Sequence, residues 1–400
     1  MLGISTTFFG ERRFPRRCAR LRSNVVLRPS ETDLSKRRIC SCCEDIIPSE
    51  KKLNDKAQKR RSRGERERLD PRATPTEPRY EAFLIARKRS AVDLLRRLLF
   101  RSDMLIHLAQ RQRCGVILVF HEIPKDTVEE FHNLLQYLSK HFAILPLEAL
   151  LERSLRRKSE RSTLLALSFD DGLRNHRSVI YPVLTDLNLP ATFYVCPGLI
   201  GRTNTTWTWE MWCRIPWLSE AHRHTICELG GIAAPSTIET ILRWMKTLTL
   251  EKRGFVEREI RLRTPEFAFT DAELGLFELM SWEELEELNP GLINIGSHTM
   301  THCDLPPLSP EQLAVEIEGS RAELEARLQR PVRDFCYPDG LYNEAVVRAV
   351  ARVYQTAVTA ICGGIRRGDP PHTLKRIGAE PDPQWMGWLL ATHTGPAHRC

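Results

Sequence analysis

The chain has 400 residues, of which 42% are hydrophobic and 28% charged, and it carries a formal net charge of +8. This composition is typical of a globular protein, and the length exceeds one average domain while fitting a single α/β barrel with insertions. No segment is apolar and long enough to span a bilayer, and the charged start lacks the apolar core and small-residue cleavage site of an ordinary signal peptide. We therefore expect a cytoplasmic protein.

The positive charge is concentrated in the first hundred residues, as in the segment Lys59–Arg68, KRRSRGERER. Residues 1–79 have little apolar periodicity and contain Pro71, Pro75 and Pro78, a pattern that predicts a disordered basic leader. Such an arm could attract anionic lipid or nucleic acid. No nucleic-acid motif with interleaved aromatic residues accompanies it, so we expect no nucleic-acid partner.

A basic amphipathic helix is predicted over residues 80–113. Apolar residues recur there at spacings of three, four and seven, while arginines and lysines fill the other faces. The apolar positions are Ala91, Leu94, Leu98, Leu105 and Leu108. The helix either packs on its own domain or lies on an anionic membrane surface, which would place the protein at the inner face of the membrane.

Residues 114–400 show an alternation of short β-rich runs and amphipathic helices, which is typical of an α/β fold with parallel strands and crossover helices. A helix after the strand at 292–297 is expected to start at Ser309, because Ser309, Pro310 and Gln312 stand in capping-box order. The other predicted strands are 116–120, 164–169, 191–195, 334–338 and 355–359, and the other predicted helices lie near 127–141, 177–187 and 343–353.

The rhythm breaks between residues 201 and 280, where mostly helical periodicity predicts an insertion. The segment Thr205–Trp212, TTWTWEMW, places three tryptophans within six residues. Two interpretations remain open for them, a small hydrophobic core or a wall on which a sugar ring stacks.

Two short motifs follow two of the predicted strands. Asp170 and Asp171 come directly after the strand at 164–169, and His298 and His302, four residues apart, follow the strand at 292–297. On a helical turn, that spacing puts both imidazoles on one face, where they can share a metal ion. One carboxylate and two histidines would leave a fourth position for water, as in a catalytic zinc site, and the other carboxylate would be free to take a proton.

Together with FCYPDG at residues 335–340, the motifs SFDDG and SHTMTH resemble the three motifs of polysaccharide deacetylases, carbohydrate esterase family 4, which includes the nodulation-type chitooligosaccharide deacetylases. The resemblance runs from about Val116 to Ile377. It implies a distorted (β/α) barrel with fewer than eight regular strands and an active site at the carboxyl ends of the strands. It also implies metal-dependent hydrolysis of N-acetyl groups on an amino-sugar-containing glycan or glycolipid precursor.

The resemblance implies a role for each motif residue. Asp170 matches the general base, which takes the proton of the attacking water, and the backbone N–H of Asp339 matches the oxyanion donor. Asp171, His298 and His302 match the ligands of a divalent metal, for which zinc is the expected ion. His121 in HEI resembles the opening strand of the family.

Two positions depart from the family pattern. Cys336 stands where many members have an arginine that pairs with the base. Members with YPxG at this motif often have a later arginine before an apolar strand, and the resemblance makes Arg376 in LKRIG the expected replacement. The late histidine that serves as general acid has only a poor match in His393, so the base could instead return its proton to the leaving amine.

Two other functions stay open on the sequence alone. A related metal-dependent amidase would act on a non-sugar amide, and a non-catalytic glycan- or membrane-binding protein would act through its basic arm. The identity of the sugar and the oligomeric state are not determined by these motifs.

Overall fold

The apolar runs rich in valine, leucine, isoleucine and phenylalanine form the strands of one parallel sheet, as their continuous hydrophobicity predicts. Every pair of neighbouring strands in the sheet runs parallel. The strands are β1 (Gly115–Phe120), β2 (Ala143–Ile144), β3 (Leu164–Phe169), β4 (Ala191–Val195), β5 (Ile293–Ser297), β6 (Asp334–Cys336), β7 (Thr356–Cys362) and β8 (Leu374–Gly378).

The computed structural model describes residues 99–100, 103–156, 162–232 and 237–394. The predicted leader, residues 1–79, and the first part of the predicted basic helix, residues 80–98, lie outside the described residues.

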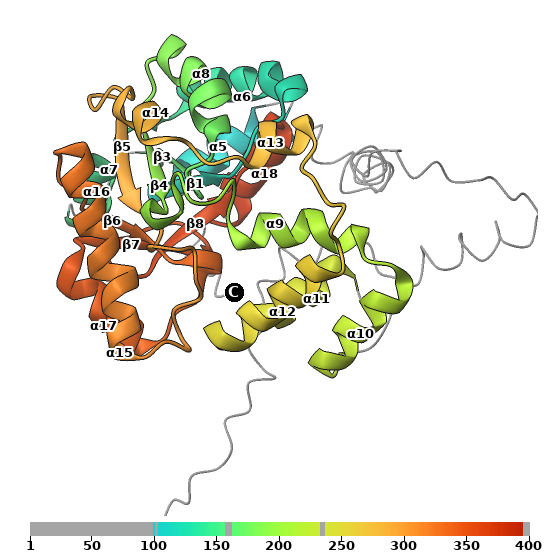
Figure 1. Ribbon diagram of the computed structural model, residues 1–400. Coiled ribbons are helices and arrows are strands. Elements are labelled where there is room, and N and C mark those ends of the chain that lie inside the picture. The colour runs from blue at the N-terminus through green and yellow to red at the C-terminus, as the bar shows by residue number, and fades with distance from the viewer. Residues whose placement is uncertain (1–98, 101–102, 157–161, 233–236, 395–400) are drawn as a thin grey trace, which may run out of the picture. The chain divides into compact units, whose positions relative to one another are not determined.

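The sheet closes into a barrel, because β1 pairs with both β3 and β8 (Figure 1). Within the described residues, seven strands form the ring in the order β1-β3-β4-β5-β6-β7-β8, and the short β2 pairs with the start of β3. The distorted (β/α) barrel with fewer than eight regular strands is therefore confirmed.

Helices cover the outside of the barrel (Figure 1). The predicted capping box is present, since Gln312 N–H donates to Ser309 Oγ and Ser309 N–H donates to the Gln312 side chain. These outer helices are α5 (Met104–Arg111), α6 (Val128–His141), α7 (Leu147–Leu151), α8 (Tyr181–Asp186), α15 (Pro310–Ala314), α16 (Ser320–Leu328), α17 (Glu344–Val353) and α18 (Pro383–Thr392). All of them except α5 and α18 lie in connections between strands.

Side chains alternate along the strands between two separate hydrophobic clusters. Ala166, Tyr194 and Cys336 belong to the smaller cluster inside the barrel, whereas Phe169 and Phe335 belong to the larger one between the sheet and the helices. Successive residues of a strand point to opposite faces. Every second residue therefore points into the barrel, and where this alternation continues past the carboxyl end of a strand, the inward-pointing side chain lies at the mouth of the barrel.

The insertion between β4 and β5 is helical, as predicted, and has its own core. Trp207 is 8% exposed within this core, so one of the three tryptophans has the structural role that the first interpretation gave them. The helices are α9 (Trp207–Arg214), α10 (Glu220–Gly230), α11 (Ile238–Met245), α12 (Leu250–Leu262), α13 (Asp271–Phe277) and α14 (Trp282–Glu286).

The described residues of the predicted basic helix include α5. This helix follows Asp103, whose backbone is left-handed with φ 55°. It packs against α18 and buries Leu105, Ile106 and Ala109. Leu108, which the periodicity placed on the apolar face, is exposed, because contact with α18 decides which face is buried. None of the described helices combines the length and apolar composition needed to cross a membrane.

Gly296 on β5 allows a close approach that fixes the barrel interior. A Cβ atom at this position would lie 2.5 Å from the ring of Tyr194 and 3.0 Å from the carbonyl oxygen of Asp334. We expect Gly296→Ala to lower the free energy of unfolding by about 1–3 kcal/mol, since neither neighbour can move away without strain. Urea unfolding measures this.

The matched control is Gly275→Ala on α13, where an added Cβ meets open space. Alanine should leave stability unchanged or raise it by up to about 1 kcal/mol there, because it is the better helix former. Equal stability of the Gly296→Ala variant and the wild type would show that the Tyr194 contact does not constrain the barrel.

Candidate active site

The turn after β3 separates two consecutive carboxylates. Asp170 continues the inward series of β3, whereas Asp171 and Gly172 adopt left-handed conformations with φ 75° and 67°. Both aspartates are 3% exposed. A buried carboxylate is stable only when it is paired, and the turn directs the two side chains to different partners.

The partner of Asp170 is Arg376 on β8, as the sequence predicts. Arg376 Nη1 donates to Asp170 Oδ1 at 2.7 Å and Nη2 donates to Oδ2 at 2.8 Å. The guanidinium is itself held by Nε–H, which donates to the carbonyl oxygen of Thr359 at 2.8 Å. This bidentate geometry fixes the orientation of the Asp170 carboxylate.

The pair keeps Asp170 ionised. Burial by itself would raise the pKa of Asp170, but the charge of Arg376 and its hydrogen bonds outweigh burial and hold that pKa well below the ordinary value. Arg376 stays protonated, because its own pKa is raised by the same contact despite burial. At neutral pH the site therefore presents a carboxylate at this position.

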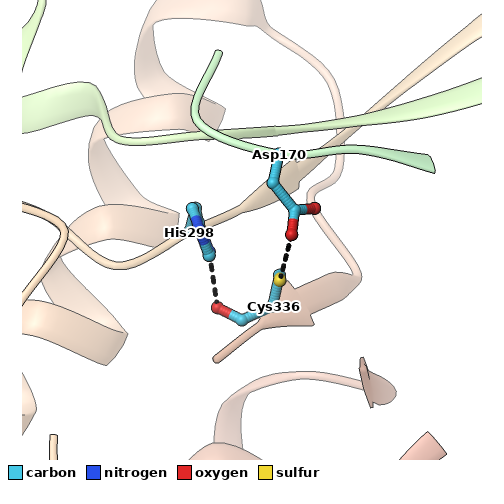
Figure 2. Close-up of side chains that lie close together, drawn as sticks. All are labelled: Asp170, His298 and Cys336. Carbon is cyan, nitrogen blue, oxygen red and sulfur yellow. Dashed lines mark hydrogen bonds between the residues drawn. The ribbon is translucent and has the colours of Figure 1, made fainter. Parts of the chain in front are cut away.

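Cys336 on β6 lies beside this pair. Its thiol is 3.5 Å from Asp170 Oδ2 and 3.3 Å from Arg376 Nη2. Figure 2 shows that the residue also contacts His298, whose Nδ1 lies 2.9 Å from the Cys336 carbonyl oxygen. The small side chain at this position leaves room for the guanidinium that arrives from β8.

Asp171, His298 and His302 form the second cluster of the site. Asp171 Oδ1 is 3.5 Å from His298 Nε2 and 3.0 Å from His302 Nε2, and all three side chains are buried. Because a carbonyl oxygen can only accept, His298 donates its Nδ1–H to Cys336, and its Nε2 is the atom that faces Asp171. Two imidazoles and one carboxylate match the donors that zinc binds.

The turn that carries the histidines is not a helix, so the helical-turn explanation of their spacing is wrong. Thr299 and His302 have left-handed conformations, with φ 67° and 55°. An irregular turn brings both imidazoles to Asp171, and such conformations are costly for residues other than glycine. The surrounding contacts must therefore hold this turn in place.

A second group that could bind a metal, Asp170, His298 and Cys336, overlaps the first. In this group both oxygens of Asp170 accept hydrogen bonds from Arg376. Burial also raises the pKa of the Cys336 thiol, which disfavours the thiolate that a metal would require. Asp171, His298 and His302 are therefore the better candidate ligands.

Two tryptophans of the insertion reach the same cluster. Trp209 Nε1 donates to Asp171 Oδ2 at 2.8 Å, and Trp207 Nε1 donates to the His302 carbonyl oxygen at 2.9 Å. The sequence gave no role at the site to these N–H groups. The signal that points to them is the spacing of two tryptophans across one threonine at the start of a helix, next to a predicted active site.

The third motif forms a tight turn over Pro338–Gly340, in which Asp339 is left-handed with φ 54°. Its side chain pairs with Lys246, which directly follows α11 of the insertion. Within the described part of the chain, the Asp339 N–H donates to no backbone or side-chain acceptor. That donor is therefore available to a ligand.

Two further candidate histidines are His121 and His393. Against the effect of burial, the charge of His121 contributes to lowering the pKa of Asp170 and Asp171, so its side chain lies near the site. His121 follows β1, and its carbonyl oxygen lies 2.8 Å from Nε2 of the buried His176. His393 comes directly after α18, which packs on α5 and α6, and its Nδ1 lies 2.8 Å from Thr392 Oγ1.

Comparison with known proteins gives one family. The sequence model of the family described as Polysaccharide deacetylase matches residues 157–358. A curated relative, YxkH of Bacillus subtilis (strain 168), carries the name of a polysaccharide deacetylase and is 30% identical over 100 residues, which is 25% of this chain and 36% of the relative. The matched segment thus spans about a third of that relative.

Two solved structures are among the matches. IcaB from Ammonifex degensii is 20% identical, with a TM-score of 0.45 over 70% of this chain and 97% of that chain. The Streptococcus pyogenes deacetylase PplD, solved in complex with acetate, is also 20% identical, with a TM-score of 0.45 over 70% of this chain and 98% of that chain.

The contact of Arg376 with Asp170 makes a prediction about pH dependence. In Arg376→Ala, burial of Asp170 is no longer opposed by the nearest positive charge, so the pKa of the carboxyl rises. A larger fraction of Asp170 is then protonated at a given acidic pH, and the acidic limb of the pH–rate profile should move upward by about one to three pH units. Lysine should restore the profile only in part, since it lacks the planar fork.

The matched control is Arg348→Ala, because Arg348 is an exposed arginine paired with Glu344 on the surface of α17. Its acidic limb should coincide with that of the wild type. An acidic limb that stays in place in Arg376→Ala would remove Arg376 from the mechanism.

Proposed function

The chain belongs to the polysaccharide deacetylase family, hydrolases that act on carbon–nitrogen bonds, and we propose that it removes N-acetyl groups from an amino-sugar-containing glycan or glycolipid precursor. The observation that carries this proposal is the separation of the two adjacent carboxylates. Asp170 is paired with Arg376 alone among the charged side chains within 4 Å that the structure describes, while Asp171 faces two imidazoles. One carboxylate is thus poised as a base and the other as a metal ligand.

We propose that Asp171, His298 and His302 hold one divalent ion, with zinc as the expected metal. Their three donor atoms lie within 4.8 Å of one another. A zinc ion bound there would lower the pKa of water and polarise the amide carbonyl. The backbone carbonyl of Cys336 orients His298, and the indole of Trp209 occupies the second oxygen of Asp171.

Asp170 is proposed as the general base. The carboxylate stays ionised because Arg376 lowers its pKa. Oδ2 accepts from both Arg376 and the Cys336 thiol, whereas Oδ1 accepts from Arg376 and retains a second lone pair. A water molecule adds its oxygen to the acetamide carbonyl carbon and gives its proton to Asp170. Asp170 then returns that proton to the amine as the carbon–nitrogen bond breaks, and the products are acetate and a free amino sugar.

The backbone N–H of Asp339 is proposed as the donor to the oxyanion that develops on the carbonyl oxygen. Lys246 engages the carboxylate of Asp339, which keeps the side chain away from its own N–H and fixes the turn. The left-handed backbone at Asp339 directs this N–H differently from its neighbours.

The metal assignment predicts about one zinc ion per chain after dialysis against zinc and removal of the excess. His298→Ala and His302→Ala should each lower the bound amount, and the double variant should retain none, because one carboxylate is too few ligands. Elemental analysis of the purified variants measures this. His224→Ala, which changes an exposed histidine of α10 paired with Glu228, should bind as the wild type does. Full zinc content in the double variant would disprove the assignment.

Substitution of the two aspartates should have different effects on metal binding and activity. Asp170→Asn should keep its metal and lose activity by about two to four orders of magnitude, the usual contribution of a positioned base, whereas Asp171→Asn should lose metal affinity. Acetate release from N-acetylated oligosaccharides and from lipid-linked amino sugars measures activity, with non-sugar amides assayed beside them. Metal loss in Asp170→Asn but not in Asp171→Asn would reverse the roles, and acetate release from the non-sugar amides alone would make the protein an amidase.

A further inference from the structure

The first turn of α9 contacts both loops that carry the candidate metal ligands. Trp209 donates its indole N–H to Asp171 after β3, and Trp207 donates its indole N–H to His302 after β5. We propose that these two tryptophans of the insertion are positioning residues of the metal centre, which set the geometry of its ligands without touching the ion. This inference rests on the metal site of the proposed function.

Trp209 engages one oxygen of Asp171 and leaves the other available to bind an ion. Oδ2 accepts the indole hydrogen bond at 2.8 Å, whereas Oδ1 faces the Nε2 atoms of His298 and His302 at 3.5 and 3.0 Å. With one oxygen engaged, the carboxylate cannot rotate freely and offers a single oxygen. A hydrogen bond to the outer oxygen of a ligating carboxylate fixes its orientation and raises metal affinity.

Trp209 is itself held by aromatic neighbours. Its ring stacks on Phe277 of α13, with centroids 4.3 Å apart and an interplanar angle of 16°, and it meets the edge of Trp212 at 6.5 Å. These contacts fix the direction of the indole N–H, so little side-chain entropy would be lost when an ion binds.

Trp207 supports the turn of the histidines. Its N–H donates to the carbonyl oxygen of His302 at 2.9 Å, and its ring is buried in the core of the insertion beneath the guanidinium of Arg253 at 4.4 Å. His302 has a left-handed backbone, which is unfavourable for a residue with a side chain. The hydrogen bond from the insertion helps to hold this conformation.

The hydrogen bonds account for tryptophan at both positions. A hydrophobic core or a sugar-stacking wall needs only an aromatic ring, which phenylalanine also provides, whereas these contacts need a ring that carries an N–H donor. In Figure 1, α9 lies between the barrel and the helices α10, α11 and α12, and it packs against α11 and α12. The folded insertion is thereby linked to the ligand geometry.

The test is the affinity of the full chain for Zn²⁺, measured by competition with a chromophoric chelator. We expect Trp209→Phe to weaken binding about 10- to 100-fold, the range found when an outer partner of a metal ligand is removed. Trp207→Phe should weaken it about fivefold, as for one hydrogen bond between neutral groups. Replacement of Trp209 by 3-benzothienylalanine, which keeps the bicyclic ring and removes the N–H, should reproduce the loss seen with phenylalanine.

The control is Trp217→Phe, because Trp217 is 48% exposed and packs edge-on against Phe267, not against a candidate ligand. Its zinc affinity should equal that of the wild type. The Co²⁺-loaded protein adds a spectroscopic readout, since Trp209→Phe should change the visible absorption bands that report ligand geometry and Trp217→Phe should not.

Three outcomes would overturn the inference. Affinity of the benzothienylalanine protein equal to that of the wild type would show that the N–H has no role. An equal loss in Trp217→Phe would show a general weakening of the insertion. Absence of zinc binding in the wild type would refute the metal site itself, which separates failure of the proposed function from failure of this inference alone.

Discussion

Closure of the parallel sheet is the constraint on which the site depends. β1 pairs with β3 on one side and with β8 on the other, so residues at the carboxyl ends of β3 and β8 meet across β1. Asp170 and Arg376 are 206 positions apart in the sequence and are joined by two hydrogen bonds only because the ring closes. The ion pair offsets the desolvation free energy of burying both charges. Either charge buried without its partner would be strongly destabilising.

The same rim gives two neighbouring carboxylates different chemistry. Asp170 keeps the inward alternation of β3 and meets a permanent cation, whereas the left-handed turn at Asp171 directs the next carboxylate to imidazoles and an indole. The negative charge of each carboxylate is thus balanced by its own partners, which offsets the repulsion between the two carboxylates. Cys336, between Asp170 and His298, contacts both halves of the site without a full charge of its own (Figure 2).

The insertion is part of the site as well as a separate small core. α9 supplies two indole donors to the metal-ligand residues, and Lys246 after α11 fixes the turn of Asp339. Left-handed backbone at Thr299, His302 and Asp339 accompanies these contacts. Such conformations persist where surrounding structure holds them, and here part of that structure comes from a segment that interrupts the barrel rhythm.

The sequence alone determined six of the eight described strands, all except β2 and β8, together with the helical insertion and the motifs, because alternation, helical periodicity and capping are local properties of neighbouring residues. It also indicated Arg376 as the partner of Asp170, although only a resemblance singled it out among the many arginines. Tertiary structure decided the rest. Three features depend on which elements pack together. They are the irregular turn that joins His298 to His302, the exposure of Leu108 beside α18, and the hydrogen bonds from Trp207 and Trp209 to the candidate metal ligands. Such contacts join residues far apart in the chain, and local sequence patterns carry no record of them.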